Sequence, residues 1–249
     1  MKALFRVALI AALLPAALVA QSTIRFNGSD TITRKLQPFA PGIGAARSVE
    51  IKFTPNGVGN GIADLVAGRA EAAMVIGNVD YFARLLNEAT PGSVDATKFR
   101  LFRLPEQFAA PATLVTHTSN PVKALTRDQI REIFTGQITN WKQVGGPDLA
   151  IIPVVQQPMD GYLAALSVVI VHGSVPTTTA KRVTKSADLC PVVAQTPGAI
   201  AFLSSAVATE EVNRLPIEPA LIPPSLLVTI GDPAEPLLSI INDFVAKAK

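Results

Sequence analysis

Short apolar runs alternate with amphipathic stretches along most of the chain. Runs typical of buried strands are followed by polar or glycine-containing turns, and then by segments whose apolar residues recur about every three or four positions. The runs predict strands at Thr23–Phe26, Val49–Phe53, Ala72–Ile76, Thr113–Thr118, Leu149–Val155 and Ala199–Leu203. The amphipathic segments predict helices near Thr31–Phe39, after residues 57–61 and from about Tyr162. Such repetition predicts an α/β fold of mainly parallel sheets flanked by helices.

Two further helices have clear start signals in the sequence. Thr126 and Gln129 match a capping box, in which each side chain accepts a hydrogen bond from the other residue's backbone N–H. Near the C-terminus, we expect Asp232 to cap a helix that has Pro233 at its first position and Glu235 as the capping partner. Each signal precedes an amphipathic segment, so both segments are predicted to be helical.

Two proline-containing connections divide the chain. Phe102–Pro111 and Pro216–Pro224 lie between the sets of predicted strands and helices, and we interpret them as crossings between two lobes. On this interpretation residues 21–105 and 206–249 form the first lobe and residues 106–205 form the second. A chain that crosses twice between two α/β lobes encloses a cleft and has two hinge segments.

The composition is that of a folded protein with a substantial core. Of the 249 residues, 49% are hydrophobic and 16% are charged, and the net charge of +3 is small, which excludes an intrinsically disordered chain. The single cysteine, Cys190, excludes a disulfide scaffold, and its apolar neighbours predict that it is buried. Aromatic residues make up 6% of the chain and the basic residues form no stripe, so we expect no binding to nucleic acid.

The first twenty residues have the layout of a secretory signal peptide. Lys2 and Arg6 form a basic start, Ala8–Leu18 is almost continuously apolar, and Ala20 precedes the polar Gln21. We therefore predict a cleaved signal at residues 1–20 and a soluble, periplasmic mature protein. The alternative is an uncleaved N-terminal anchor.

Candidates for catalysis are few. The sequence contains two histidines, His117 and His172, and none of the common nucleophile, zinc-protease or nucleotide-binding motifs. Two histidines and one cysteine also make a zinc site improbable. We therefore predict a protein that is not an enzyme and needs no cofactor or metal ion.

Three polar loops are better candidates for a function. Gly28–Thr31, Gly57–Asn60 and Gln156–Tyr162 each join the end of a predicted strand to the start of a predicted helix. Ligands of open α/β sheets bind at that end of the strands, and the free N–H groups at a helix start favour an anion. The alternative is that all three are ordinary turns and helix caps.

Three segments are specific enough to indicate a family. Residues 125–146 are LTRDQIREIFTGQITNWKQVGG, residues 26–32 are FNGSDTI and residues 196–202 are TPGAIAF. Together they resemble the phosphate-type periplasmic solute-binding proteins of ABC transporters, in their second-lobe segment, first ligand loop and late G-A-I-G-Y strand. The resemblance implies a periplasmic-binding-protein fold with two lobes and two hinge crossings. It also implies a soluble protein that closes on a small ligand and offers it to an inner-membrane permease.

The third ligand loop departs from the family's R-x-x-x-S-G-T pattern. Gln156, Asp160 and Tyr162 replace the arginine, serine and threonine, while Gly161 is retained. In the second loop, Val58 stands where the family usually has serine. An arginine–phosphate fork is a strong, charge-assisted contact, and an added carboxylate repels a dianion. We therefore expect phosphate to bind weakly or not at all near neutral pH.

The expected ligand contacts combine the three loops with one acidic residue. Glu71 corresponds to a family acid that accepts a proton-bearing oxygen, and Arg34 is placed to compensate for the missing arginine. The candidate binding residues are Ser29, Asp30, Thr31, Gly57, Val58, Gly59, Glu71, Gln156, Asp160, Gly161 and Tyr162.

These features predict an exported solute-binding protein whose ligand is small and polar or anionic. The main alternative is a binding fold that has lost transport and acts as a sensor, scaffold or interaction module. A secreted hydrolase would need a nucleophile and a base, and neither Ser29 nor His117 has a sequence context that supports such a role.

Overall fold

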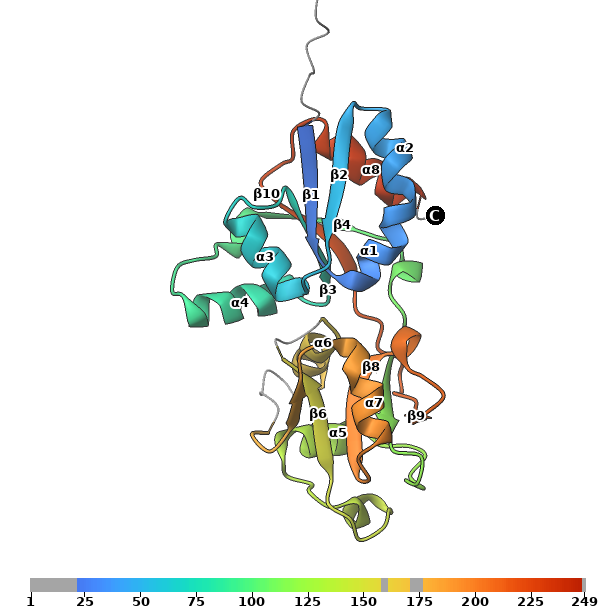
Figure 1. The fold of residues 1–249 in the computed structure, drawn as a ribbon. Coiled ribbons are helices and arrows are strands. Elements are labelled where there is room, and N and C mark those ends of the chain that lie inside the picture. The colour runs from blue at the N-terminus through green and yellow to red at the C-terminus, as the bar shows by residue number, and fades with distance from the viewer. Residues whose placement is uncertain (1–21, 158–160, 171–176, 248–249) are drawn as a thin grey trace, which may run out of the picture.

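Two five-stranded sheets form the framework of the molecule, one above the other in Figure 1. The computed structural model describes residues 22–157, 161–170 and 177–247, so the predicted signal peptide lies outside the described residues. The strands are β1 (Ser22–Gly28), β2 (Val49–Thr54), β3 (Ala72–Ile76), β4 (Phe99–Arg103), β5 (Ala112–Thr116), β6 (Ile152–Gln156), β7 (Lys181–Val183), β8 (Ala199–Ser204), β9 (Asn213–Leu215) and β10 (Ser225–Ile230). The helices are α1 (Asp30–Leu36), α2 (Ala40–Ala45), α3 (Val58–Val66), α4 (Val79–Ala89), α5 (Arg127–Thr135), α6 (Gly161–Val169), α7 (Leu189–Ala194) and α8 (Leu237–Lys247).

The two sheets share one topology. Their strand orders are β2-β1-β3-β10-β4 and β7-β6-β8-β5-β9. In the first sheet β1 pairs in parallel with β2 and β3, whereas β10 is antiparallel to β3 and β4. In the second, β6 is parallel to β7 and β8, whereas β5 is antiparallel to β8 and β9. Each described sheet is therefore parallel apart from one reversed strand, and that strand is the first to follow a crossing between the sheets.

The crossings lie close to where the prolines predicted them. The chain leaves the first sheet after β4 and enters the second at β5, and it returns between β9 and β10. One correction concerns β9, which falls within residues 206–249 predicted for the first lobe. Because β9 pairs with β5, it belongs to the second sheet, and the chain crosses back only after it. The other predicted domain limits stay predictions.

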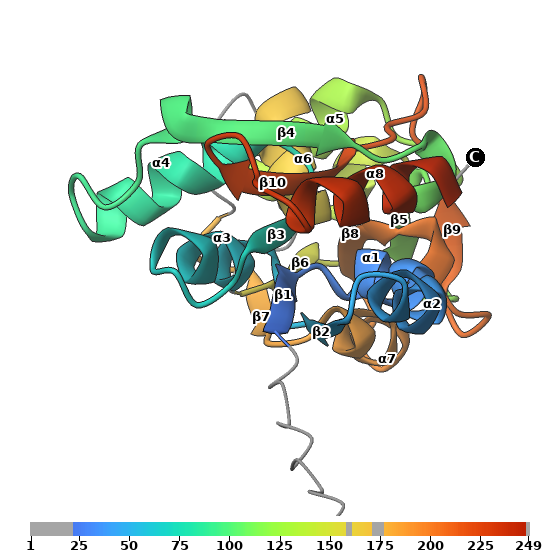
Figure 2. The same ribbon diagram turned by 90° about the horizontal axis from the view of Figure 1, so that it is seen from above.

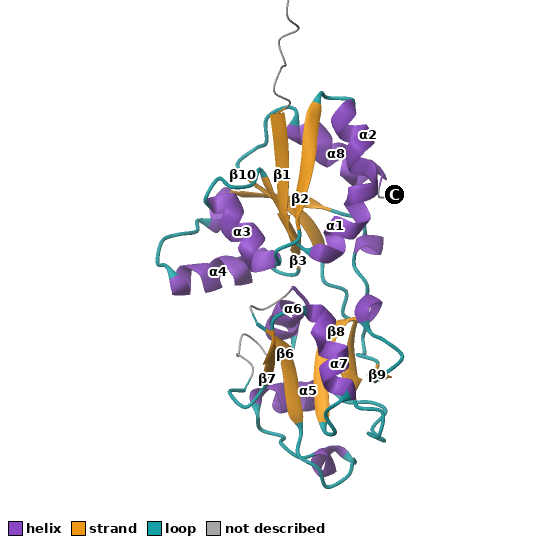
Figure 3. Ribbon diagram, viewed as in Figure 1, coloured by secondary structure: helices purple, strands orange, loops and turns teal. Residues whose placement is uncertain are grey.

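Helices cover both faces of each sheet (Figures 2 and 3). In the first lobe α1, α2 and α8 pack on the face that carries Met74 and Ile76, while α3 and α4 pack on the opposite face with Ala73 and Val75. In the second lobe α5 and α6 cover one face and α7 covers the other. This two-sided burial explains why β3 is apolar at every position. Cys190, on α7, is buried as predicted.

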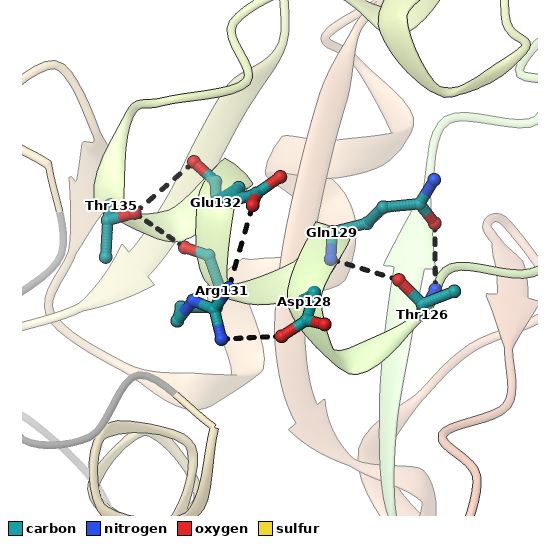
Figure 4. Close-up of polar contacts among 6 residues, drawn as sticks. All are labelled: Thr126, Asp128, Gln129, Arg131, Glu132 and Thr135. Atoms are coloured by element: carbon teal, nitrogen blue, oxygen red, sulfur yellow. Dashed lines mark hydrogen bonds and ion pairs between the residues drawn. The ribbon is translucent and has the colours of Figure 1, made fainter.

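The capping box of α5 is confirmed (Figure 4). The Gln129 N–H donates to Thr126 Oγ1 at 3.2 Å, and the Thr126 N–H donates to Gln129 Oε1 at 2.8 Å. Gly136 ends the helix in the left-handed conformation, with φ of 82°. This region was the most specific part of the family resemblance, and it forms an outer helix of the second lobe, away from the strand ends that face the first lobe (Figure 1).

The C-terminal helix begins later than its cap signal predicted. Helix α8 starts at Leu237, and Asp232 forms an ion pair with Arg100, at 2.6 Å, in place of capping it. The reason is the second proline, Pro236, since a residue that precedes proline is disfavoured in the helical conformation. Across the described residues, none of the helices combines the length and the apolar character that a membrane span requires.

Candidate ligand-binding site

One cavity of about 440 Å³ lies where the strand ends of the two lobes meet. The first lobe contributes Ser29, Asp30, Thr31, Arg34, residues 55–60 and Ile76 to its lining. The second contributes Gln156, Tyr162, residues 184–187 and Val207. The cavity therefore adjoins the carboxyl ends of β1, β2, β3, β6 and β7, as expected for an α/β fold. The three loops predicted from the sequence all reach it, and the turn after β7 and Val207, which follows β8, are two further contributors that the sequence did not reveal.

The first loop is held against the neighbouring strand. The Ser29 N–H donates to the carbonyl of Met74 at 2.9 Å, and Ser29 Oγ caps α1 by accepting from the Ile32 N–H at 3.4 Å. A Cβ at Gly28 would lie 2.4 Å from the same Met74 carbonyl oxygen, so this position requires glycine. Ser29 itself is buried. It fixes the loop as well as facing the cavity.

The second loop forms the start of α3. Gly57 is the N-cap residue, and the three residues that follow it line the cavity. The first N–H groups of a helix have no partner within the helix, so they are available to a ligand. The Val58 side chain is buried in the core of the first lobe. A valine side chain offers no hydrogen-bond donor to a ligand in the cavity.

Charged side chains from both lobes reach the cavity. Arg34 forms an ion pair with Asp30 four residues earlier, and this contact raises the pKa of Arg34. Lys185, from the turn after β7, also lines the cavity and forms no ion pair with any other described residue. The described lining thus carries one carboxylate and two cations. Lys185 was missed because β7 is short and charged, so the sequence offered no clear strand before this turn.

The third loop is described in part. Asp160 lies outside the described residues, and Gly161 is the first residue of α6. Gln156 ends β6 and lines the cavity, with its Oε1 atom buried and without a hydrogen-bond partner in the described structure. Tyr162 is buried, and its hydroxyl donates to the carbonyl of Ala110 at 3.0 Å and accepts from the Ala110 N–H at 3.3 Å. Tyr162 therefore joins the third loop to the first crossing.

Glu71 does not belong to the cavity. It immediately precedes β3, whereas the cavity adjoins Ile76 at the other end of the strand, about 16 Å away at the usual rise per residue. Glu71 accepts hydrogen bonds from the backbone N–H of Arg25 at 2.7 Å and from Arg25 Nε at 3.1 Å. Burial alone would raise the pKa of Glu71, but these bonds lower it overall. Its predicted role in accepting a hydrogen bond from a proton-bearing ligand oxygen is wrong, because Glu71 precedes β3 and the cavity lies at the opposite end of that strand.

Of the two histidines, His117 lies in the described residues and is remote from this cavity. His117 follows β5 at the end of the second sheet away from the cavity, and its Nδ1 lies 2.7 Å from Ser119 Oγ. His172 lies outside the described residues. Within the described ranges, His, Cys, Asp and Glu side chains form no group of three or more that suits a metal ion.

Two α/β lobes with a cavity at facing strand ends define a two-lobe ligand-binding fold. Residues 16–238 match the model of the PBP superfamily domain, so the chain belongs to that superfamily.

Relatives associated with phosphate share this fold. The phosphate-binding protein PstS of Bacillus subtilis (strain 168) is 30% identical over 167 residues, covering 65% of this chain and 50% of the relative. The chain thus spans about half the length of this curated relative. An ABC-type phosphate transport receptor from Vibrio cholerae is 24% identical, covers 90% of this chain and 94% of its own, and superposes with a TM-score of 0.69. A putative phosphate ABC transporter substrate-binding protein from Clostridium perfringens, solved with bound phosphate, is 22% identical, with coverages of 91% and 98% and a TM-score of 0.70.

Proposed function

We propose that this protein is an exported receptor that captures a small anion between its lobes and offers it to an ABC permease. The observation that carries the proposal is one cavity that the ends of five strands, the start of α3 and cations from both lobes share. A ligand in this position touches both lobes, so it stabilises the closed arrangement by its differential affinity for it. The signal-like residues 1–20 and the names of the relatives support export and a permease partner.

We further propose that the preferred ligand is a singly charged oxyanion. The described lining carries two cations against one carboxylate, and the neutral Gln156 stands where the family resemblance implies an arginine. The nearby Asp160, although outside the described residues, adds a negative charge to the same loop. A dianion such as phosphate near neutral pH meets less compensating charge here than an arginine fork would supply. Phosphate is therefore expected to bind weakly.

Thermal unfolding with a panel of anions tests the proposed ligand class. A ligand that binds only the folded protein raises the melting temperature by an amount that grows with the ratio of its concentration to its dissociation constant. Nitrate and formate should raise it more than sulfate or phosphate at equal ionic strength, with chloride as the control. Equal shifts for all salts would show a general salt effect and contradict the proposal.

Lobe closure and export have separate tests. Small-angle scattering with nitrate should give a smaller radius of gyration than with chloride, and an unchanged radius would favour the sensor or scaffold alternative. N-terminal sequencing of protein from the periplasmic fraction should find a start close to Gln21. An intact Met1 on cytoplasmic protein would contradict export.

A further inference from the structure

A partly buried carboxylate on α3, that of Asp64, bonds to the residues just before both first-lobe loops. Asp64 Oδ2 accepts a hydrogen bond from Asn27 Nδ2 at 2.7 Å and another from Asn56 Nδ2 at 2.8 Å. Asn27 precedes Gly28, where the first loop begins, and Asn56 precedes Gly57, the cap of α3. The Asp64 side chain is 14% exposed and is absent from the cavity lining. One oxygen atom therefore joins the bases of two loops that reach the cavity.

The bonding pattern requires an ionised acid at this position. Arg69 Nε donates to the second oxygen, Oδ1, at 2.7 Å, so the carboxylate accepts from two amides and one guanidinium. A carboxylate is acceptor-only, whereas an amide would present hydrogens to one of these donors. Burial alone would raise the pKa of Asp64, but the bonds from Asn27, Arg69 and Asn56 lower it overall. Asp64 is thus ionised at neutral pH, with its charge balanced by Arg69.

Both asparagines bond to Asp64 through their Nδ2 atoms, while their Oδ1 atoms accept no hydrogen bond in the described structure. These Oδ1 atoms are buried. Turning either amide over would place its oxygen against the Asp64 carboxylate, which is a repulsive contact. The carboxylate therefore fixes the orientation of Asn27 and Asn56, and through them the backbone at the start of each loop.

The backbone around Asp64, Asn27 and Asn56 restricts the movement of the two loops and of α3. The Gly57 N–H donates to the Gly28 carbonyl at 2.9 Å, which links the two loops directly. At Gly61, one turn before Asp64 on α3, an added Cβ would lie 2.5 Å from the carbonyl oxygen of Asn27. Helix α3 is thus in close contact with β1, and Asp64 extends this contact with side-chain bonds.

We propose that Asp64 is the positioning residue of the anion site, holding the loops at Gly28–Thr31 and Gly57–Asn60 in the arrangement that presents their N–H groups to the cavity. Asp64 acts through Asn27 and Asn56 and does not contact the ligand. The proposal rests on the proposed function for its effect on binding, but its effect on the loops is independent of any ligand.

Hydrogen exchange tests the effect on the loops. In Asp64→Asn the hydrogen-bonded amides of Gly57 and Gly61 should exchange about tenfold faster or more, because loss of a hydrogen bond to a charged group changes a local equilibrium by about that factor. The matched control is Glu71→Gln, which removes a similarly bonded carboxylate at the other end of β3 and should leave these amides unchanged. Equal exchange in both variants would overturn the proposal. If Asp64→Asn fails to fold, Asn56→Ala removes one bond and should give the same pattern more weakly.

Nitrate titration tests the effect on binding. Calorimetry at a temperature where both variants are folded should show about tenfold weaker binding in Asp64→Asn and unchanged binding in Glu71→Gln. Fast loop exchange with unchanged nitrate affinity would overturn the positioning role. If the wild-type protein binds no anion of the panel, the proposed function fails, and the exchange data still decide whether Asp64 holds the loops.

Discussion

The two walls of the cavity are built in different ways. On the first-lobe wall, backbone groups are held by other backbone groups, as in the bonds from Gly57 to Gly28 and from Ser29 to Met74, each 2.9 Å long. The second-lobe wall includes the neutral Gln156, whose Oε1 atom has no hydrogen-bond partner in the described structure, and Lys185, which forms no ion pair with any other described residue. The difference suggests a division of roles, in which the first lobe supplies a fixed set of N–H donors and the second lobe supplies the charge that selects the ligand.

The largest effect is expected from forcing the first-lobe wall apart. In Gly61→Val the new Cβ meets backbone atoms, at 2.5 Å from Asn27 O and 2.6 Å from Gly28 Cα, so α3 must move off β1. We expect a loss of about 2–3 kcal/mol in the free energy of unfolding, typical of overpacking, and no detectable anion binding. Urea denaturation measures the first effect. The control Gly42→Ala has open space around the new methyl group and should be no less stable than wild type.

Acid should weaken the first-lobe wall. The pKa of Asp64 is lower in the folded protein than in the unfolded chain, where it is about 4. The contribution of Asp64 to the free energy of unfolding is therefore complete above about pH 4, and it is lost as the pH falls through the lower pKa of the folded state. Hydrogen bonds to a charged group contribute about 1.5–3 kcal/mol each, so the loss is measurable. Urea midpoints should fall less on acidification in Asp64→Asn than in wild type or in Asp80→Asn, an exposed control. Equal falls in all three would contradict this assignment.

Removing the Tyr162 hydroxyl tests how firmly the third loop of the second-lobe wall is held to the first crossing. Tyr162→Phe leaves the N–H and carbonyl of Ala110 without these two bonds, so we expect a loss of about 1 kcal/mol in the free energy of unfolding. Because the bonds join the third loop to a crossing, scattering by the anion-free variant should show a more open average shape. Thermal unfolding without any shift would show that the bonds contribute nothing.

Neutralising Lys185 tests the selective role of the second lobe. Lys185→Gln should weaken nitrate binding about fivefold, near the upper limit for an exposed charge pair, without changing stability. Lys181→Gln is the matched control, since Lys181 is an exposed lysine on β7 that does not line the cavity. If the two variants bind nitrate equally well, Lys185 does not contact the ligand.

The smallest effect is expected at the ion pair on α1. Asp30→Asn removes a negative charge from the cavity and releases Arg34, so nitrate should bind about twofold more tightly. Both side chains are largely exposed, which limits the gain, and added salt should reduce it further. Calorimetry at low ionic strength is the measurement. A weaker affinity would mean that Asp30 holds Arg34 in a useful position.

Local patterns were enough to predict much of the fold. The apolar run at Ala72–Ile76 and the capping box at Thr126 are determined by adjacent residues, and the structure has both as predicted. Strand β9 was assigned to the wrong lobe, and β10 was not expected next to the proline-rich crossing. The sheet to which β9 and β10 belong is determined by pairing with strands that are distant in the sequence. The residues of a short strand do not show which strand it will pair with.

The site was predictable where it depended on strand ends, and less so where it depended on side chains. Ser29 and Gly57 reach the cavity because they follow two parallel strands of the first sheet, and Gln156 reaches it because it ends a strand of the second sheet on the side that faces the first lobe. Glu71 was misplaced because its position in the sequence does not show at which end of β3 the cavity lies. Glu71 precedes the strand, and the cavity adjoins Ile76 at the opposite end. Lys185 carried no signal beyond a lysine in a polar turn, and only the packing of β7 beside β6 brings it to the cavity.

The most direct test is a nitrate titration followed by the amide NMR signals of the uniformly labelled protein at constant ionic strength. We expect residues 58–60 of the first wall and Lys185 of the second to shift together along one saturable curve, and phosphate near neutral pH to need a higher concentration for the same change. Shifts that grow linearly with salt, or that spare one wall, would contradict a shared anion site, and a submicromolar affinity for phosphate would contradict the proposed preference for a single charge.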